Sequence, residues 1–349
     1  MSGQAPVADR PVTVTGQATE HGARVAPPGG WRATLLVVCY RMKDTVLEAV
    51  EGALAQTVAC EIIVSDDSSC AETLPLVRDR LRDYAGPHRV IVRSTASNIG
   101  LCAHLNELAA IATAPVLFNS AGDDVSLPER VDTLLRVFDA EPDAQIVGSR
   151  VDDVDAQGRL IEAGVRGLPA RVDQRWLINR GKLATILGAS MAFRTTLLTD
   201  LPPLEGRVED NMLMLRGALI GVCRCLPVSL IRYRRHDHNL GDWVFDRSER
   251  GYEGWKRRQL RVAEMYVEIA DDQLRCIEAR PDLPSHRRQA GQALQALYRL
   301  EALQRVTMIE QPRSRWIAPL MQGLKTRGLR RKSAERALKL LLPRKQFGR

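Results

Sequence analysis

The sequence predicts an α/β fold in which a mostly parallel sheet, covered by helices on both faces, precedes a C-terminal helical extension. Three observations predict it. Strand-length apolar runs alternate with helical patterns over roughly residues 33–140, which is typical of a parallel sheet. A pair of aspartates directly follows two of the expected strands, where α/β sheets bind their ligands. Beyond residue 240 the helical patterns continue with almost no strand signal.

The N-terminal segment, residues 1–30, contains hardly any large apolar side chains and ends in Pro27-Pro28-Gly29-Gly30. Because such a segment cannot bury a core, we expect it to be disordered. Thr45 and Glu48 have the spacing of a capping box at the start of the first helix. The alternating pattern predicts strands at residues 35–39, 61–64, 90–92 and 116–118, and helices at residues 74–84 and 101–112.

The fourth strand leads into the loop Gly122-Asp123-Asp124, after which Ser126, Pro128 and Glu129 favour the start of a helix. The mixed signals that continue to Asn239 complete the same domain. They indicate a hairpin at residues 147–161, strands near residues 189–193, 222–226 and 229–233, and a helix at residues 211–220. We therefore expect an α/β domain over residues 31–240 and a helical region with a basic tail over residues 241–349.

The composition is that of a globular protein, with 349 residues of which 45% are hydrophobic and 26% charged. The absence of an 18-residue uncharged apolar run, and of an apolar stretch near the start, predicts a cytoplasmic protein. The seven cysteines are odd in number and lack the spacing of a disulfide framework. A zinc site at Cys223 and Cys225 would lack a second ligand pair, so we expect reduced, buried thiols.

The net charge of +8 is concentrated in residues 312–349, which hold twelve lysines and arginines and a single acid, Glu335. The rest of the chain is close to neutral, and the tail has no interleaved aromatic platform, so nucleic acid is not a predicted partner. Apolar runs at residues 316–321 and 337–342 beside the basic residues suit an anionic membrane surface, here the inner face of the cell membrane. The alternative is a basic helix packed on the body or on a partner subunit.

Asp123 and Asp124 present two hard carboxylates in a turn, which suits Mg²⁺ or Mn²⁺ held jointly with a diphosphate. Alone, this signal is weak, because an Asp pair before a helix more often caps it. The motifs around the pair make it specific. In chain order they are Val37-Val38-Cys39-Tyr40, Gln56-Thr57, residues 61–69 (EIIVSDDSS), Asn98-x-Gly100, Gly122-Asp123-Asp124 with Pro128, Gly188-Ala189-Ser190-x-x-Phe193-Arg194, and Glu209-Asp210.

In this order and spacing the motifs resemble bacterial glycosyltransferase family 2, an inverting family with the GT-A fold, which is a Rossmann-like domain for nucleotide-diphospho-sugars. The resemblance spans residues 33–240. It implies a hexosyltransferase-type enzyme that moves a sugar from a nucleotide-diphosphate donor, with UDP favoured, to a hydroxyl of a glycan or lipid-linked acceptor. By analogy with the family, the pathway is bacterial surface polysaccharide or lipopolysaccharide biosynthesis. The sugar, the acceptor and the oligomeric state are left open.

The resemblance also implies roles for single residues. Asp66 and Asp67 look like the acidic pair that reads the base and ribose, because carboxylates accept hydrogen bonds from both; the alternative is a helix cap. Asn98 either caps a helix or contacts the nucleotide. The residues implied to contact the donor are Cys39, Tyr40, Asp66, Asp67, Asn98, Gly122, Asp123, Arg234 and Arg235.

Asp210 resembles the family's catalytic base, which removes a proton from the acceptor hydroxyl; Glu209 and Asp210 also complement the positive end of a helix. The basic stretch of residues 232–239 resembles the segment that follows the final strand in similar enzymes. On this match His236, in preference to His238, joins Asp123 and Asp124 on the Mg²⁺ or Mn²⁺ ion, and Arg234 or Arg235 holds phosphate.

The chain departs from the family pattern at two positions, with Ala121 where many members have an acid and Arg41 where Asn is common. The first departure leaves the metal with fewer carboxylates, and it favours one alternative function, a nucleotide-sugar-binding scaffold without turnover. Retention of Asp210 argues against that alternative. A nucleotidyltransferase would usually open with a Gly-rich phosphate loop, and residues 37–43 contain no Gly.

Overall fold

The computed structural model describes residues 18–68, 71–236, 251–343 and 347. Within these residues, eleven strands form one mixed sheet in the order β1-β4-β3-β2-β5-β10-β7-β11-β6, with β8 beside β7 and β9 beside β11. The strands are β1 (Thr19–Gly22), β2 (Thr34–Cys39), β3 (Glu61–Asp66), β4 (Arg89–Ser94), β5 (Val116–Ala121), β6 (Val125–Ser126), β7 (Ala144–Val154), β8 (Leu160–Val165), β9 (Arg171–Val172), β10 (Ala192–Arg194) and β11 (Val222–Arg234).

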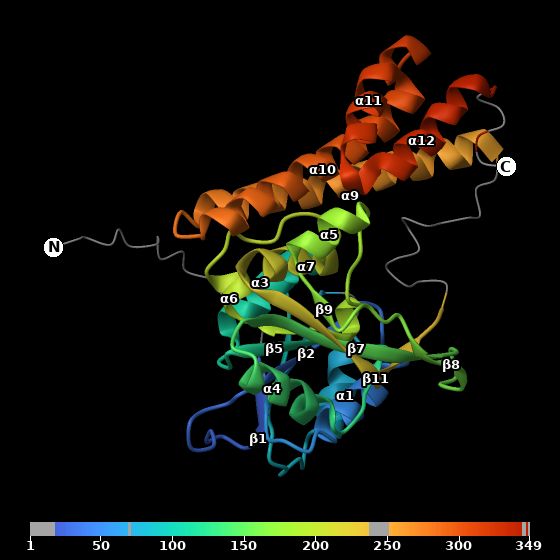
Figure 1. Ribbon diagram of the computed structural model, residues 1–349. Coiled ribbons are helices and arrows are strands. Elements are labelled where there is room, and N and C mark those ends of the chain that lie inside the picture. The colour runs from blue at the N-terminus through green and yellow to red at the C-terminus, as the bar shows by residue number, and fades with distance from the viewer. Residues whose placement is uncertain (1–17, 69–70, 237–250, 344–346, 348–349) are drawn as a thin grey trace.

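Helices cover both faces of this sheet, and a long helical layer lies beyond one of them (Figure 1). The helices are α1 (Val46–Leu54), α2 (Thr73–Arg80), α3 (Leu101–Ile111), α4 (Arg130–Ala140), α5 (Gln174–Arg180), α6 (Thr196–Thr199), α7 (Glu209–Ile220), α9 (Gly251–Ala279), α10 (Ser285–Glu310), α11 (Ile317–Lys325) and α12 (Arg330–Leu338). Short 3₁₀ turns lie at Gly188–Ser190, Arg313–Trp316, Arg327–Leu329 and Lys339–Leu341.

The central strands are apolar throughout because both of their faces are buried. Leu35 and Val37 of β2 belong to a core that includes side chains of α1, α2 and α4. Leu36 between them belongs to a second core, which includes side chains of α3, α7, α9 and α10. Successive side chains of a strand point to opposite faces, so one apolar run supplies two cores. The expected alternation of strands and helices in the first half of the chain is confirmed.

The parallel strands β3, β2 and β5 end together at one edge of the sheet. Cys39 at the end of β2 is in register with Asp66 at the end of β3, and Val38 is in register with Ala121 of β5. This register brings the segments that follow the three strands side by side. The topological position is the one at which α/β sheets bind ligands.

Several elements differ from expectation. Part of the N-terminal segment expected to be disordered, Thr19–Gly22, forms β1, which adds an antiparallel edge to β4; residues 1–17 lie outside the described residues. Strand β10 is antiparallel to both β5 and β7. The two strands expected at residues 222–226 and 229–233 are one strand, β11; Pro227 interrupts the pattern, and the pairing with β7 is irregular between Leu226 and Ser229.

The helical region rests on the face of the sheet that α5 and α7 cover (Figure 1). Helices α9 and α10 pack along each other, and α11 and α12 pack near the end of α10. Arg336 of α12 reaches the buried carboxylate of Glu301 on α10 at 2.7 Å, and Lys332 reaches it at 3.1 Å. These two basic residues of the tail are therefore held by the protein itself. Among the described helices, none has the length and apolar character needed to cross a bilayer.

Candidate active site

The turn after β5 lies against the end of β2. The amide of Gly122 donates to the carbonyl of Val38 (2.9 Å), and the hydroxyl of Thr45 donates to the carbonyl of Gly122 (2.9 Å). A Cβ at position 122 would lie 2.6 Å from the Sγ of Cys39, so only glycine permits this approach. Thr45 does precede α1, but its hydroxyl serves this turn and makes no side-chain cap, so the predicted capping box is wrong.

Asp123 meets His236 at this edge of the sheet. The Oδ2 of Asp123 lies 2.7 Å from the Nε2 of His236, which follows the end of β11. Asp123 is 93% buried and His236 is 25% exposed at its side chain, so the pair borders solvent on the histidine side. The structure thus brings together two of the three residues expected to hold a metal; His238 lies outside the described residues.

Asp124, the next residue of the turn, is almost fully buried. Its Oδ1 accepts a hydrogen bond from the amide of Arg234 (2.9 Å), while its Oδ2 is buried without a hydrogen-bond partner among the described residues. Burial, and then the charge of Asp123, raises the pKa of Asp124 well above its usual range. An unsatisfied buried carboxylate oxygen calls for a cation or a proton.

Arg234 ties four segments together from a buried position. Its Nε donates to the carbonyl of Asp123 (3.0 Å), its Nη1 to the carbonyl of Ala156 in the β7–β8 turn (2.7 Å), and its Nη2 to Glu48 of α1 (2.6 Å). Arg235 differs, because its side chain is 44% exposed and its contact with Asp153 is 3.7 Å long. Of the two arginines expected to hold phosphate, Arg235 is therefore the one available to a ligand.

Four of the nine residues expected at the nucleotide lie at the ends of β2 and β3 or directly after them. Asp66 is buried at the end of β3, and Tyr40 is 39% exposed just after β2, with the guanidinium of Arg41 5.1 Å from its ring centre. Arg41, which stands where the family commonly has Asn, adopts a positive φ of 58°. The backbone here is strained into the left-handed region.

Asp67 holds the loop that leads into α3. Its Oδ1 accepts from the hydroxyl of Thr95 (2.9 Å) and the amide of Ile99 (3.0 Å), and its Oδ2 accepts from the amide of Gly100 (2.8 Å). Gly100 is the N-cap of α3, so the capping alternative for Asn98 is wrong and its side chain is left exposed to solvent. Asp67 therefore shapes the loop that presents Asn98.

Glu209 and Asp210 form the first turn of α7. The Oδ1 of Asp210 accepts from the amide (2.7 Å) and the side-chain Nδ2 (2.9 Å) of Asn211. Burial raises the pKa of Asp210 to about 6. Burial, and then the charge of Asp210, raises the pKa of Glu209 to about 8. The pKa of Asp210 is the lower of the two, so Asp210 loses its proton before Glu209 does as the pH rises.

Comparison with known proteins identifies the family. Residues 34–217, more than half of the chain, match the model of Glycosyl transferase family 2. The chain belongs to this family. It is a glycosyltransferase, as the order and spacing of the motifs predicted. The family 2 region contains Asp66, Asp123 and Asp210, whereas Arg234 and His236 lie beyond the matched residues.

Two relatives of this glycosyltransferase match it over 196 and 212 residues. EpsE of Bacillus subtilis (strain 168), which is named as a glycosyltransferase, is 28% identical over 196 residues, covering 54% of this chain and 66% of EpsE. An uncharacterized protein of Mycobacterium tuberculosis (strain ATCC 25618 / H37Rv) is 26% identical over 212 residues, covering 59% of this chain and 60% of that protein. The chain thus spans less than two thirds of either relative.

Solved structures of similar fold include TarS from S. aureus. The crystal structure of TarS residues 1–349 matches with a TM-score of 0.51 at 17% identity, covering 90% of this chain and 81% of TarS. A structure of the same TarS fragment in complex with UDP-GlcNAc matches with a TM-score of 0.51 at 16% identity, covering 88% of this chain and 90% of that one. The likeness confirms a GT-A fold with a C-terminal helical region for this glycosyltransferase.

Arg130 is a residue of this site that sequence reasoning missed. It is fully buried in the first turn of α4 and donates to the carbonyls of Asn119 (2.7 Å) and Ala189 (2.8 Å) and to the hydroxyl of Ser126 (2.9 Å). It thereby joins β5 to the Gly188–Ser190 turn, which packs against Glu209 and Asp210. No local signal marks it, because a basic residue near a helix start normally faces solvent.

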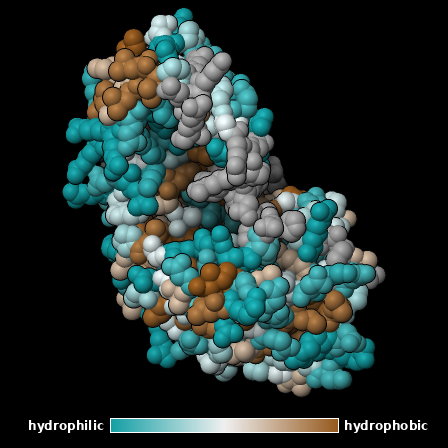
Figure 2. Space-filling view, turned by 90° about the vertical axis from the view of Figure 1, so that its right-hand side faces the viewer, coloured by the Kyte–Doolittle hydropathy of each residue, from teal (hydrophilic) through white to brown (hydrophobic). Residues whose placement is uncertain are grey.

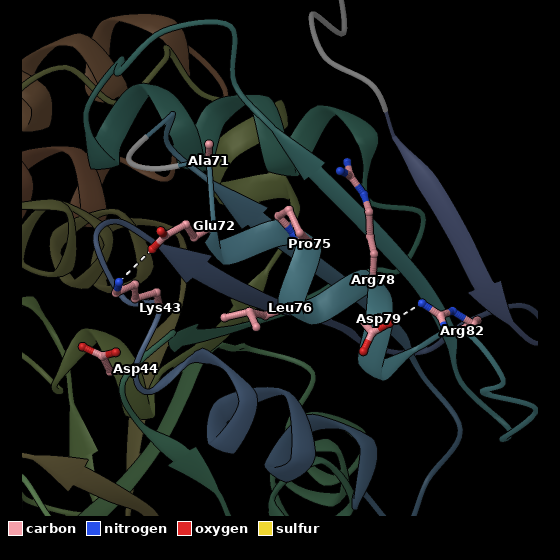
Figure 3. Close-up of a pocket in the computed structure, with 9 residues that line it drawn as sticks. All are labelled: Lys43, Asp44, Ala71, Glu72, Pro75, Leu76, Arg78, Asp79 and Arg82. Carbon is pink, nitrogen blue, oxygen red and sulfur yellow. Dashed lines mark hydrogen bonds and ion pairs between the residues drawn. The ribbon is translucent and has the colours of Figure 1, made fainter.

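A pocket beside the site is lined by charged side chains that pair with one another (Figure 3). Lys43 and Glu72 form an ion pair of 2.7 Å across it, and Arg82 pairs with Asp79. Its lining residues are Lys43, Asp44, Ala71, Glu72, Pro75, Leu76, Arg78, Asp79 and Arg82. None of the site aspartates lines it, so we do not assign the family 2 chemistry to this pocket.

Proposed function

We propose that this glycosyltransferase moves a sugar from a nucleotide-diphosphate donor to an acceptor hydroxyl with inversion, and that Asp210 is the base. The observation that carries the proposal is the pair of carboxylates opening α7, of which Asp210 has the lower pKa, about 6 against about 8 for Glu209. A carboxylate of this basicity is still ionised at neutral pH and accepts a proton more readily than an ordinary Asp. Asp210 removes the hydroxyl proton as that oxygen attacks the anomeric carbon, and the diphosphate departs from the opposite face.

The donor nucleotide would lie over the carboxyl ends of β2, β3 and β5. Tyr40 offers an exposed ring to the base, Asp66 stands at the end of β3, and Asp67 sets the loop that presents Asn98. Cys39 and Gly122 form the floor through their close contact, and Arg235 is the cation for the diphosphate. UDP is the favoured carrier; a TarS structure of similar fold contains UDP-GlcNAc, which supports this choice.

Mg²⁺ or Mn²⁺ is the proposed cofactor, with Asp123 and His236 as ligands and Asp124 as the next residue of the turn. The adjoining Asp123 and His236 atoms and the unsatisfied Oδ2 of Asp124 suit a hard cation. Among the residues that the structure describes, no three His, Cys, Asp or Glu side chains are grouped as metal ligands. Donor phosphates and water would complete the shell, as Ala121 in the usual acidic place implies. When bound, the ion neutralises charge on the departing diphosphate.

We further propose a glycan or lipid-linked acceptor in bacterial surface polysaccharide or lipopolysaccharide biosynthesis, with the tail at the inner face of the cell membrane. The end formed by α11 and α12 exposes five large apolar side chains. They are Ile317, Met321, Leu338, Leu341 and Leu342, and we call them the apolar pad. Figure 2 shows hydrophobic residues, in brown, gathered at the upper end of the molecule. Arg313, in the 3₁₀ turn before α11, donates a hydrogen bond to the carbonyl of Leu342, in the segment after α12. Basic side chains beside an exposed apolar surface suit anionic lipid.

This function divides the chain as the sequence suggested, with catalysis in residues 31–240 and docking in residues 241–349. The proposal is tested by titrating UDP-GlcNAc, UDP-glucose, UDP-galactose and GDP-mannose into the full chain with Mg²⁺, Mn²⁺ or EDTA, followed by transfer assays. We expect metal-dependent binding of a UDP-sugar and a product of inverted anomeric configuration by NMR. Failure of every donor to bind in a metal-dependent way would overturn it.

A further inference from the structure

Helix α9 has a row of three acidic side chains on the side that faces α7, the helix that begins with Glu209 and Asp210. Glu264, Glu268 and Asp272 are spaced four residues apart, which places them on one face of a helix. All three contact the segment that leads into α7 or α7 itself. Figure 1 shows α9 lying alongside α7, although the two helices come from different regions of the chain.

Two members of this row hold Arg207, which precedes Asp210 by three residues. Glu268 accepts the backbone amide of Arg207 (3.1 Å) and its Nε (3.2 Å), and Glu264 accepts its Nη2 (3.1 Å). Because Glu268 accepts from the backbone amide as well as from the guanidinium, it holds both the main chain and the side chain of Arg207 in place. Helix α9 therefore fixes the position of the loop that leads into α7.

The third member holds α7 from the other end. The carboxylate of Asp272 receives the Nε (2.9 Å) and Nη2 (2.5 Å) of Arg216, and both side chains are fully buried. Arg216 also donates to the carbonyls of Leu197 (2.9 Å) and Pro202 (2.8 Å). Helix α7 is therefore bound to α9 at two places: at Arg207, just before its first turn, and at Arg216, in its second half.

We propose that α9 is the positioning element of the catalytic base, with Glu268 and Glu264 acting through Arg207 to set the place of Asp210. The inference rests on the proposed role of Asp210 and assigns to the helical region a part in the reaction itself. A displacement of about 1 Å of a catalytic group is enough to cost about 10²-fold in rate.

The exposure of Arg207, Glu264 and Glu268 allows an effect on the position of Asp210 to be distinguished from an effect on folding. The side chains of Arg207 and Glu264 are more than half exposed, and that of Glu268 is 24% exposed. Ion pairs at such exposed side chains contribute little to stability. Their removal should therefore leave the fold intact while releasing the loop before Asp210.

The experiment compares the double variant Glu264→Ala/Glu268→Ala with Glu268→Gln and with the control Asp271→Ala. Asp271 is also on α9 but pairs with Arg299 of α10, away from the loop. Transfer from the donor that the screen above identifies gives kcat and KM, calorimetry gives the affinity for UDP with Mn²⁺, and melting gives Tm. We expect the double variant to lose at least tenfold in kcat while KM for the donor, UDP affinity and Tm stay near wild type. Glu268→Gln retains an oxygen for the Arg207 amide and should keep most activity, and the control should be unchanged.

An unchanged kcat in the double variant would overturn the inference, as would a loss shared with Asp271→Ala or accompanied by a matching fall in Tm. The variant Asp210→Asn separates this inference from the function on which it rests. If that variant is inactive while the double variant is normal, only the positioning role fails. If Asp210→Asn transfers sugar normally, the assignment of the base fails and the positioning role fails with it.

Discussion

Asp123 and His236, which are 113 residues apart in the chain, meet through a contact of 2.7 Å between Oδ2 and Nε2. One residue follows β5 and the other follows β11, and no strand pairing joins those two strands directly. Arg234 brings the two segments together, because its amide and guanidinium bind the Asp123–Asp124 turn two residues before His236. The pair joins the family 2 region of the chain to a segment beyond it.

Substitution of either member of this pair should weaken metal-dependent donor binding. We expect His236→Ala and Asp123→Asn each to weaken Mn²⁺-dependent UDP binding at least tenfold, because each takes away one of the two proposed protein ligands. Isothermal titration with Mn²⁺ or with EDTA measures the effect, and the exposed His286→Ala provides a histidine control. Binding of UDP that is equally tight in all variants would count against a metal at this pair.

The acid side of the pH–rate profile should report Asp210. Burial raises the pKa of Asp210 to about 6, so the protonated form, which cannot act as a base, predominates below that pH. We expect kcat to fall about tenfold for each pH unit below about 6 in wild type. The variant Asp210→Asn should lose about 10²–10⁴-fold in kcat and lose this limb. A wild-type profile that stays flat down to pH 5 would exclude Asp210 as the group that limits the rate.

Arg234 and Arg235 should respond differently to substitution. Arg234→Lys removes the planar fork that reaches Asp123, Ala156 and Glu48 together, so we expect a lower Tm and weaker UDP binding. Arg235→Ala should leave Tm unchanged and raise KM for the donor several-fold, since its side chain is exposed. Melting curves and donor kinetics of the two variants measure these effects. A raised KM with an unchanged Tm in Arg234→Lys, and a lower Tm in Arg235→Ala, would mean that Arg234 is the phosphate ligand.

The buried pair Arg216–Asp272 should dominate the stability of the contact between α7 and α9. Asp272→Ala leaves the guanidinium buried without its counter-ion, so we expect a loss of about 3–5 kcal/mol in the free energy of unfolding. The double variant Arg216→Met/Asp272→Leu should recover part of it, limited by the unpaired carbonyls of Leu197 and Pro202. Urea unfolding measures both. An Asp272→Ala protein as stable as wild type would contradict the burial of this pair.

Charge placed in the apolar pad should weaken membrane binding. Leu338→Glu/Leu341→Glu adds two negative charges at side chains that are 65% and 83% exposed, so the fold should tolerate them. We expect the variant to co-sediment with phosphatidylglycerol vesicles much less than wild type does. Val25→Glu, at an equally exposed apolar residue in the N-terminal segment, serves as the control. Equal sedimentation of all three proteins would favour the alternative in which the tail packs only on protein.

Local patterns predicted the parts of the fold that depend on period and composition. The strands at residues 35–39, 61–64 and 116–118 and the helix at 101–112 were confirmed because an apolar run buried on both faces, or a stripe at helical spacing, has one stable arrangement. Irregular partners were not predictable in this way. Pro227 indicates a break between two strands, but pairing with β7, which is distant in the chain, continues past it and makes β11 one strand.

The sequence by itself determined the family, the GT-A fold and the order of the acidic motifs, because short local motifs in a characteristic order and spacing indicate all three. Tertiary structure alone decided what those residues do to one another. It assigned Asp67 to the loop before α3, Thr45 to the Gly122 turn and Arg234 to a four-way tie, and it brought Arg130 beneath the site. Hydrogen bonds and burial join groups that are distant in the chain, so no local pattern of residues encodes them.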